Sequence, residues 1–170
     1  IKFTAANPFE RFSDGRPKVP DELLKKVEGL SIEEAWGLLR EKGYVNQFEV
    51  GWKILHPEKK LVGRAVTAVF MPVRPDLAKV ADDVAKSMGF LRNSNQRVID
   101  TLQPGDVLVV DLFGKIEGGT IVGDNLAAAV FNSTKTGIVV DGAIRDLEGV
   151  FPIPMGLYYR GVHPSAINNV

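Results

Sequence analysis

Residues 105–146, GDVLVVDLFGKIEGGTIVGDNLAAAVFNSTKTGIVVDGAIRD, carry the strongest structural signals in the sequence. Residues 107–110 are apolar at every position, which is typical of a strand that is covered on both faces. Asp111 is predicted to end this strand. A glycine-bearing loop follows, and the alanine-rich run 126–131 then predicts a helix that ends in the turn 133–137.

A second apolar strand follows this helix. Residues 138–140, Ile-Val-Val, repeat the apolar pattern, and Asp141 and Gly142 are predicted to end it. A strand, a helix and a strand of these lengths form a βαβ unit with parallel strands and a right-handed connection. Both strands therefore end at the same edge of the sheet, where open α/β sheets bind their ligands.

Charged residues stand at both segments that reach this edge. Asp124 directly precedes the helix and is well placed to cap it, while Arg145 and Asp146 follow the second strand. We expect the two carboxylates and the guanidinium to converge there. Taken alone, Asp124 is more often a cap than a ligand, and Arg145 with Asp146 could be a surface ion pair of little energetic value.

The start of the predicted helix also offers a place for an anion. Backbone N–H groups at a helix N-terminus lack partners within the helix and carry a partial positive charge. The amides of Asn125, Leu126 and Ala127 are therefore candidates for holding a substrate carboxylate, with Asp124 directed at the water shell of a metal ion.

Several further motifs accompany this unit in a defined order along the chain. They are Gly63-Arg64-Ala65-Val66-Thr67, the strand 105–111, Gly119-x-x-x-Gly123-Asp124, the run 140–146 (Val-Asp-Gly-Ala-Ile-Arg-Asp) and Arg160-Gly161-Val162. In this order they resemble the RraA-like family, which includes the class II pyruvate aldolases acting on 4-hydroxy-4-methyl-2-oxoglutarate and 4-carboxy-4-hydroxy-2-oxoadipate. The ordered set is far more specific than any one motif in it.

The resemblance implies an α/β fold of the three-layer β/β/α swivelling type. Its central parallel sheet would contain the strands 106–111 and 137–141, and a second sheet would be largely antiparallel. Residues 1–60 are expected to form an N-terminal arm and helices packing on the core, and residues 61–170 the RraA-like core of a single domain. Relatives typically continue with further strands and a C-terminal segment, so part of the fold would be missing if this sequence is a trimmed version of a longer one. They are trimers or hexamers with sites at subunit interfaces, and a homotrimer or hexamer is expected.

By the same resemblance, the expected activity is that of a metal-dependent lyase that cleaves a carbon–carbon bond of a 2-oxo acid and releases pyruvate. Retro-aldol cleavage and oxaloacetate-type decarboxylation both pass through a metal-stabilised enolate. The expected cofactor is Mg²⁺ or Mn²⁺, with Asp146 as its direct ligand and Asp124 orienting metal-bound water. Arg145 is assigned to the 2-oxo oxygen as it becomes an oxyanion. The residues expected to bind substrate are Gly123, Asn125, Leu126 and Arg145.

Two other functions remain open. The namesake of the family is a non-catalytic protein that binds and inhibits an RNA-processing endonuclease, but such members lack the complete acidic site that this sequence keeps. A hydratase or another lyase acting on a sugar acid would use the same enolate chemistry. Retro-aldol cleavage also needs a base, which decarboxylation does not. Glu148 is the nearest candidate for the further carboxylate of some relatives, and aldolase members draw an acid from a neighbouring subunit.

Composition excludes several other classes of site. The 170 residues include 21 basic and 21 acidic side chains, so no net charge favours nucleic acid or an anionic membrane as a partner. Cysteine is absent, which excludes disulfides, thiolate zinc sites and a cysteine nucleophile. His56 and His163 lie far apart, and we interpret both as structural. Neither a dinucleotide fingerprint nor a phosphate loop occurs. With no apolar run long enough to span a bilayer, a cytoplasmic protein is expected.

Local signals predict the remaining elements. Ser31 and Glu34 form a capping box for a helix that ends at Gly43, and its apolar stripe, which includes Trp36, is expected in the core. Asp21 is predicted to cap a short helix before it. The other predicted elements are an extended arm at 1–20, strands at 61–71 and 157–162, a helix from Pro75 to Gly89 and a short helix leading to Leu102.

Overall fold

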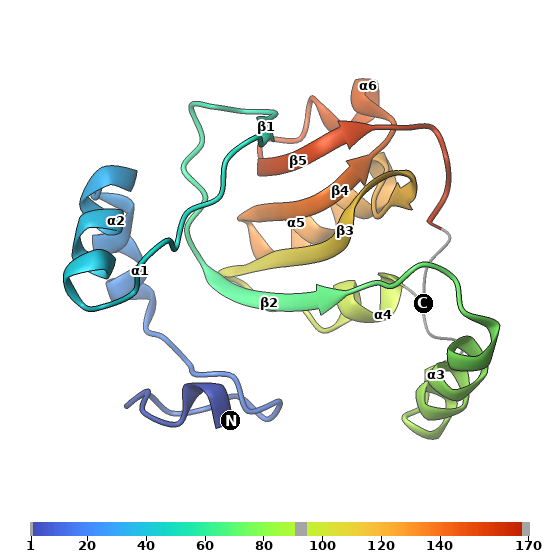
Figure 1. Ribbon diagram of the computed structural model, residues 1–170, viewed down its shortest axis with the longest axis horizontal. Helices are drawn as coiled ribbons and strands as arrows, with labels where there is room; N and C mark the ends of the chain where they lie inside the picture. The colour runs from blue at the N-terminus through green and yellow to red at the C-terminus, as the bar shows by residue number, and fades with distance from the viewer. Residues whose placement is uncertain (1, 91–94, 168–170) are drawn as a thin grey trace.

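The computed structural model describes residues 2–90 and 95–167, and these form an α/β fold around a five-stranded sheet of order β1-β5-β4-β3-β2 (Figure 1). Every neighbouring pair is parallel except the edge pair of β1 with β5. The predicted α/β class and central parallel sheet are therefore confirmed. The strands are β1 (Lys53–Ile54), β2 (Arg64–Val69), β3 (Asp106–Thr120), β4 (Gly137–Ile144) and β5 (Gly156–Val162).

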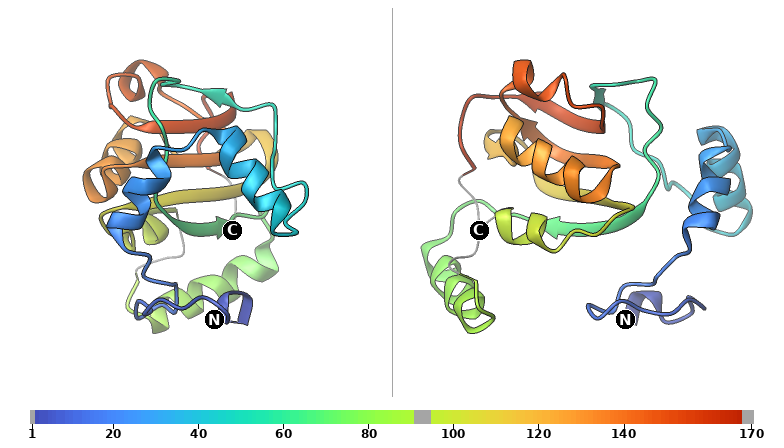
Figure 2. Two further views of the ribbon diagram at one scale, coloured as in Figure 1. Left: turned by 90° about the vertical axis from the view of Figure 1, so that its left-hand side faces the viewer. Right: turned by 180° about the vertical axis from the view of Figure 1, so that it is seen from behind.

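Helices cover one face of this sheet, which is seen from behind in the right-hand view of Figure 2. Helices α4 and α5 lie across the strands on that face, and α6 lies beside β5 at the edge of the sheet. The helices are η1 (Lys2–Thr4), α1 (Asp21–Glu28), α2 (Ile32–Glu41), α3 (Pro75–Ser87), α4 (Asn95–Asp100), α5 (Asp124–Thr134) and α6 (Leu147–Val150). The buried core between sheet and helices includes Leu108, Val110, Ala127, Val130, Ile138, Val140, Val150 and Leu157.

The opposite face of the sheet carries no helix among the described residues, as Figure 1 shows. Side chains that alternate with the core positions point to this face. Thr67, Val69 and Asp111 are exposed there, and Val109 and Val139 are half-buried. The second, largely antiparallel sheet implied by the family resemblance is not formed by residues 2–90 and 95–167.

The N-terminal helices stand beyond the amino ends of the parallel strands (Figure 1). No residue of α1 or α2 is buried. The capping box of α2 is confirmed, with Ser31 and Glu34 exchanging hydrogen bonds of 2.7 and 3.1 Å. The expectation that its apolar stripe lies in the core is wrong, since Ile32 is 61% and Trp36 40% exposed. Helix α1 begins at Asp21, whose side chain makes no cap hydrogen bond.

Strands β3 and β4 run further than their sequence predicts. Asp111 and Asp141 pair with each other and end neither strand, because the ladder resumes beyond them. Two register shifts in β3 form a large irregular bulge, in which Lys115 pairs with Gly142 and Thr120 with Ala143. The bulge carries the chain back to the end of β4. No helix within the described ranges has both the length and the apolar character to cross a membrane.

Candidate functional site

The return of β3 from its bulge places the start of α5 beside the end of β4. The N–H of Ile121 donates to the carbonyl of Ala143 at 3.1 Å, and the N–H of Arg145 donates to the carbonyl of Val122 at 3.1 Å. These two bonds bring the Gly123–Asp124 junction next to Arg145 and the residue after it. The backbone segments that carry Asp124, Arg145 and Asp146 therefore meet at the carboxyl edge of the sheet.

The carboxylate of Asp146 lies directly over Gly123. A Cβ atom at residue 123 would be 2.1 Å from Asp146 Oδ2 and 3.1 Å from Arg145 Nε, so a side chain at this position would displace the carboxylate. Asp146 itself has a left-handed backbone, with φ 55° and ψ 44°. This conformation costs an L-residue about 1 kcal/mol, although aspartate tolerates it better than most residues. The local fold therefore holds Asp146 in a defined place.

Asp124 is the second residue of the same junction. It is the first residue of α5 rather than its cap, and Gly123 takes the cap position without a side-chain bond, so the predicted side-chain cap is wrong. A carboxylate in the first turn still interacts favourably with the helix dipole. The Asp124 carboxylate accepts the N–H of Asn125 at 2.7 Å. It also packs against Gly149 of α6, where an added Cβ would be 2.8 Å from Asp124 Oδ2.

The start of α5 offers fewer free backbone N–H groups for a ligand than the sequence predicts. The N–H of Asn125 is engaged by Asp124, and the N–H of Ala127 donates to the carbonyl of Gly123 at 2.9 Å. Gly123 is buried, Leu126 is half-buried and the side chain of Asn125 is exposed. Of the three amides assigned to a substrate carboxylate, that of Leu126 is therefore the strongest remaining candidate.

The charged side chains of the site are open to solvent. Arg145 Nε lies 3.3 Å from Asp146 Oδ2, and these side chains are 40% and 47% exposed. Glu148 is also exposed, on α6. Carboxylate and guanidinium groups in this state keep hydrogen-bonding capacity for a ligand. The role of Gly149 was missed because nothing in the local sequence signals its approach to Asp124.

Two carboxylates at one edge suit a hard divalent cation. Among the described residues, no three His, Cys, Asp or Glu side chains are grouped closely enough to hold a metal ion by themselves. Mg²⁺ is commonly held by one or two carboxylates and keeps several water or substrate ligands. Asp124 and Asp146 are therefore the residues that could hold Mg²⁺ or Mn²⁺, in an open site rather than in a closed cage made only of protein ligands.

A second cluster of arginine and aspartate lies at the amino edge of the sheet, around the first residue of β3. Asp106 is 0% exposed. Its carboxylate accepts hydrogen bonds from both Nη groups of Arg16, at 3.1 and 3.3 Å, and from the backbone N–H of Gln103 at 2.9 Å. Arg64 Nε lies 3.7 Å from the same carboxylate. Burial alone would lower the pKa of Arg16, but the hydrogen bonds and charges of Asp106 and Asp14 raise it.

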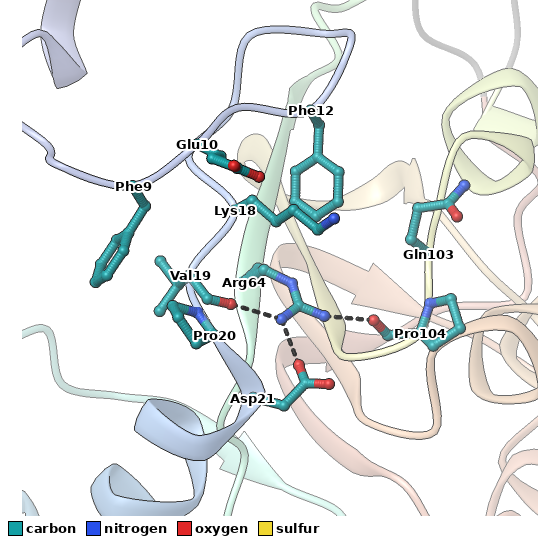
Figure 3. Close-up of a pocket in the computed structure, with 10 residues that line it drawn as sticks. All are labelled: Phe9, Glu10, Phe12, Lys18, Val19, Pro20, Asp21, Arg64, Gln103 and Pro104. Atoms are coloured by element: carbon teal, nitrogen blue, oxygen red, sulfur yellow. Dashed lines mark hydrogen bonds and ion pairs between the residues drawn. The ribbon is translucent and has the colours of Figure 1, made fainter.

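Arg64 joins this cluster to the N-terminal arm. Its guanidinium donates to the carbonyls of Val19 and Pro104 at 2.9 and 2.6 Å, and to Asp21 at 2.6 Å (Figure 3). The hydrogen bond and charge of Arg64 lower the pKa of Asp21. A cavity of about 480 Å³ lies between the arm and the sheet, with Phe9 and Phe12 on its wall. The arginine and aspartate side chains of the cluster are engaged with one another, so we interpret the cluster as a clamp that holds the N-terminal arm to the sheet.

Comparison with known proteins identifies the family of the chain. No curated protein matches it. RraAS2 of Streptomyces coelicolor, described as an unusual member of the RNase ES inhibitor RraA protein family, is 29% identical with a TM-score of 0.71, over 89% of this chain and 71% of that one. An uncharacterized protein from Pseudomonas syringae pv. tomato is 22% identical with a TM-score of 0.68, over 92% of this chain and 61% of that one.

A third structure extends the comparison of folds. The RNA-processing inhibitor RraA from Thermus thermophilis is 22% identical with a TM-score of 0.52, over 77% of this chain and 68% of that one. At these identities the Pseudomonas and Thermus structures show a shared fold alone. The model of the RraA-like family, described as Aldolase/RraA, matches residues 21–170. The chain therefore belongs to the RraA-like family.

Proposed function

We propose that the protein is a divalent-metal-dependent lyase that cleaves a carbon–carbon bond of a 2-oxo acid and releases pyruvate. The observation that carries the proposal is the position of the Asp146 carboxylate over Gly123, with Arg145 beside it and Asp124 next to Gly123 in the chain. The family includes both enzymes and non-catalytic inhibitors, as its description Aldolase/RraA indicates. Membership alone therefore does not decide between an enzyme and an inhibitor, and the proposal rests on the geometry of the site.

Each charged residue of the site has a role in this proposal. Asp146 and Asp124 would hold Mg²⁺ or Mn²⁺, Asp146 directly and Asp124 through water, and the bound ion would act as a Lewis acid on the substrate. Arg145 would donate to the 2-oxo oxygen, which becomes negatively charged as the bond to the departing fragment breaks. The N–H of Leu126 would bind the substrate carboxylate. We expect the active form to be a homotrimer or hexamer with this site at a subunit interface.

Oxaloacetate is the first substrate to test, because its decarboxylation needs no base for the carbon–carbon break. We expect pyruvate release to require added Mg²⁺ or Mn²⁺ and to stop with EDTA. Asp146→Asn should weaken Mn²⁺ binding more than Asp124→Asn, because only the first removes a direct ligand. A panel of 4-hydroxy-2-oxo acids would then separate aldolase from decarboxylase activity. Pyruvate release that survives thorough chelation would contradict the metal site.

A non-catalytic regulator is the second candidate. Its support is RraAS2, which is 29% identical and described as a member of an RNase ES inhibitor family. Such a protein would bind an RNA-processing endonuclease and inhibit it, and substitution of Arg145 or Asp146 should leave that inhibition unchanged. Inhibition of a purified endonuclease by this protein, without metal-dependent pyruvate release, would favour this candidate over the lyase.

A further inference from the structure

Helix α6 links the two aspartates of the site. The backbone carbonyl of its cap residue Asp146 accepts hydrogen bonds from the N–H groups of Gly149 and Val150 at 3.0 Å each, and Gly149 packs against the side chain of Asp124. The helix has only four residues. A helix this short has little stability of its own, because nucleation costs more than one turn of hydrogen bonds returns. Contacts with the rest of the protein must therefore hold it.

Val150 holds the inner side of α6, since it is fully buried in the core. The outer end is held from a distant part of the sequence. His56 Nε2 lies 3.0 Å from the carbonyl oxygen of Phe151, the residue that ends α6, although the two residues are 95 positions apart. A carbonyl can only accept a hydrogen bond, so the ring presents an Nε2–H group to it.

Further contacts fix the His56 ring itself. Its centroid lies 5.2 Å from that of the Phe151 ring, and its Nδ1 lies 3.5 Å from the carboxylate of Glu58. The side chain is only 13% exposed. The preceding residue, Leu55, donates its N–H to the carbonyl of Leu157 in β5 at 3.0 Å. His56 is therefore anchored to the edge of the sheet and reaches α6 from there.

We infer that His56 is a positioning residue for Asp146, acting through α6; this inference rests on the proposed function of the site. A helix rises about 1.5 Å per residue, so Asp146 lies only about one turn from the carbonyl that His56 holds. A shift at Phe151 is thus transmitted to the left-handed backbone at Asp146. It also changes how Gly149 packs against Asp124.

Two substitutions separate the hydrogen bond from the shape of the ring. His56→Phe keeps a ring against Phe151 but removes the N–H donor, whereas His56→Gln retains a side-chain N–H. Glu58→Gln is the matched control, because it removes a charge beside His56 and leaves the bond to α6 in place. Thermal unfolding of each variant, together with exchange at the buried Val130 of α5, reports whether the whole protein is affected.

The first measurement is amide hydrogen exchange at Gly149 and Val150 in metal-free protein. We expect His56→Phe to accelerate exchange at these two amides about tenfold more than at Val130, and His56→Gln to restore much of the protection. The second measurement is Mn²⁺ affinity by electron paramagnetic resonance. Loss of a residue that orients a metal ligand typically costs 10- to 100-fold in affinity, and we expect about tenfold for His56→Phe.

The outcomes distinguish this inference from the proposed function. Wild-type protein that binds no Mn²⁺ would overturn the proposed metal site. Wild-type binding that is unchanged in His56→Phe would overturn the role of His56 alone, even if exchange at Gly149 accelerates. Equal losses of affinity in the Phe and Gln variants would also overturn it, because the hydrogen bond would then not be the cause.

Discussion

Two clusters of aspartate and arginine lie at opposite ends of the parallel strands, and they differ in how far the protein itself engages their charges. At the amino end, Asp106 is completely buried and accepts hydrogen bonds from Arg16 and from the backbone. At the carboxyl end, Asp146 and Arg145 are both more than one-third exposed and lie 3.3 Å apart. The same residue types therefore occupy two very different environments.

The degree to which its charges are engaged within the protein distinguishes a structural clamp from a binding site. A carboxylate whose lone pairs are used inside the protein stabilises the fold and has little capacity left for a ligand. A half-exposed carboxylate contributes little to stability and can still bind one. We therefore expect substitutions at the amino end to change the free energy of unfolding, and those at the carboxyl end to change binding and turnover.

The largest expected effect on stability is at Asp106. Asp106→Asn leaves the guanidinium groups of Arg16 and Arg64 beside a neutral, buried amide. Breaking a buried ion pair by removing one partner costs about 3–5 kcal/mol in the free energy of unfolding. Denaturant unfolding measures this loss, and Asp146→Asn is the matched control, with an expected change within about 0.5 kcal/mol. Similar losses for both variants would remove the distinction between the two ends.

Arg145 should show the opposite behaviour. Arg145→Ala removes the donor that we propose for the developing oxyanion, so turnover should fall about 100- to 1,000-fold while stability changes little. Arg145→Lys keeps the charge but loses the planar fork and should recover only part of the loss. Steady-state kinetics at saturating metal provides the test. If Arg145→Ala raises only the Michaelis constant, the residue anchors substrate and the oxyanion role is wrong.

Gly123→Ala tests whether the position of the Asp146 carboxylate over Gly123 matters, without changing any charge. The backbone φ of −107° at this residue is accessible to alanine, but the added Cβ would overlap the carboxylate. We expect Mn²⁺ affinity to fall about tenfold, as for other changes that misplace a ligand. Gly37→Ala in α2 is the control, because a Cβ there meets nothing within 4 Å. Isothermal titration calorimetry with Mn²⁺ compares the two variants. An equal Mn²⁺ affinity for Gly123→Ala and Gly37→Ala would contradict a role of Gly123 in placing Asp146.

The smallest expected effect is a pH dependence at the amino end. Arg64 lowers the pKa of Asp21, so ionised Asp21 stabilises the folded state above the ordinary carboxylate pKa. This contribution is lost as the pH falls through the lowered pKa of the folded state. Asp21→Asn should therefore flatten the acid side of the curve of unfolding free energy against pH. An unchanged curve would show that the bond to Arg64 does not contribute.

The βαβ unit and the charged residues at its carboxyl edge could be predicted from the sequence because their signals are local. Two apolar runs, a helix between them and the parallel connection suffice to place Asp124, Arg145 and Asp146 at the same edge of the sheet. The capping box at Ser31 was likewise predicted from residues only three positions apart. The ends of β3 and β4 could not be, because the pairing of Lys115 with Gly142 depends on a bulge that no single strand signals.

Local patterns thus determined the α/β class, the parallel strands and the identity of the charged residues at their carboxyl edge. The tertiary structure alone established that Asp146 sits over Gly123 and that Arg16 binds Asp106 across 90 positions. It also established that the apolar stripe of α2 is exposed in this chain. The physical reason is that helix and strand signals arise between near neighbours, whereas burial, ion pairing and close approach depend on which distant segments meet.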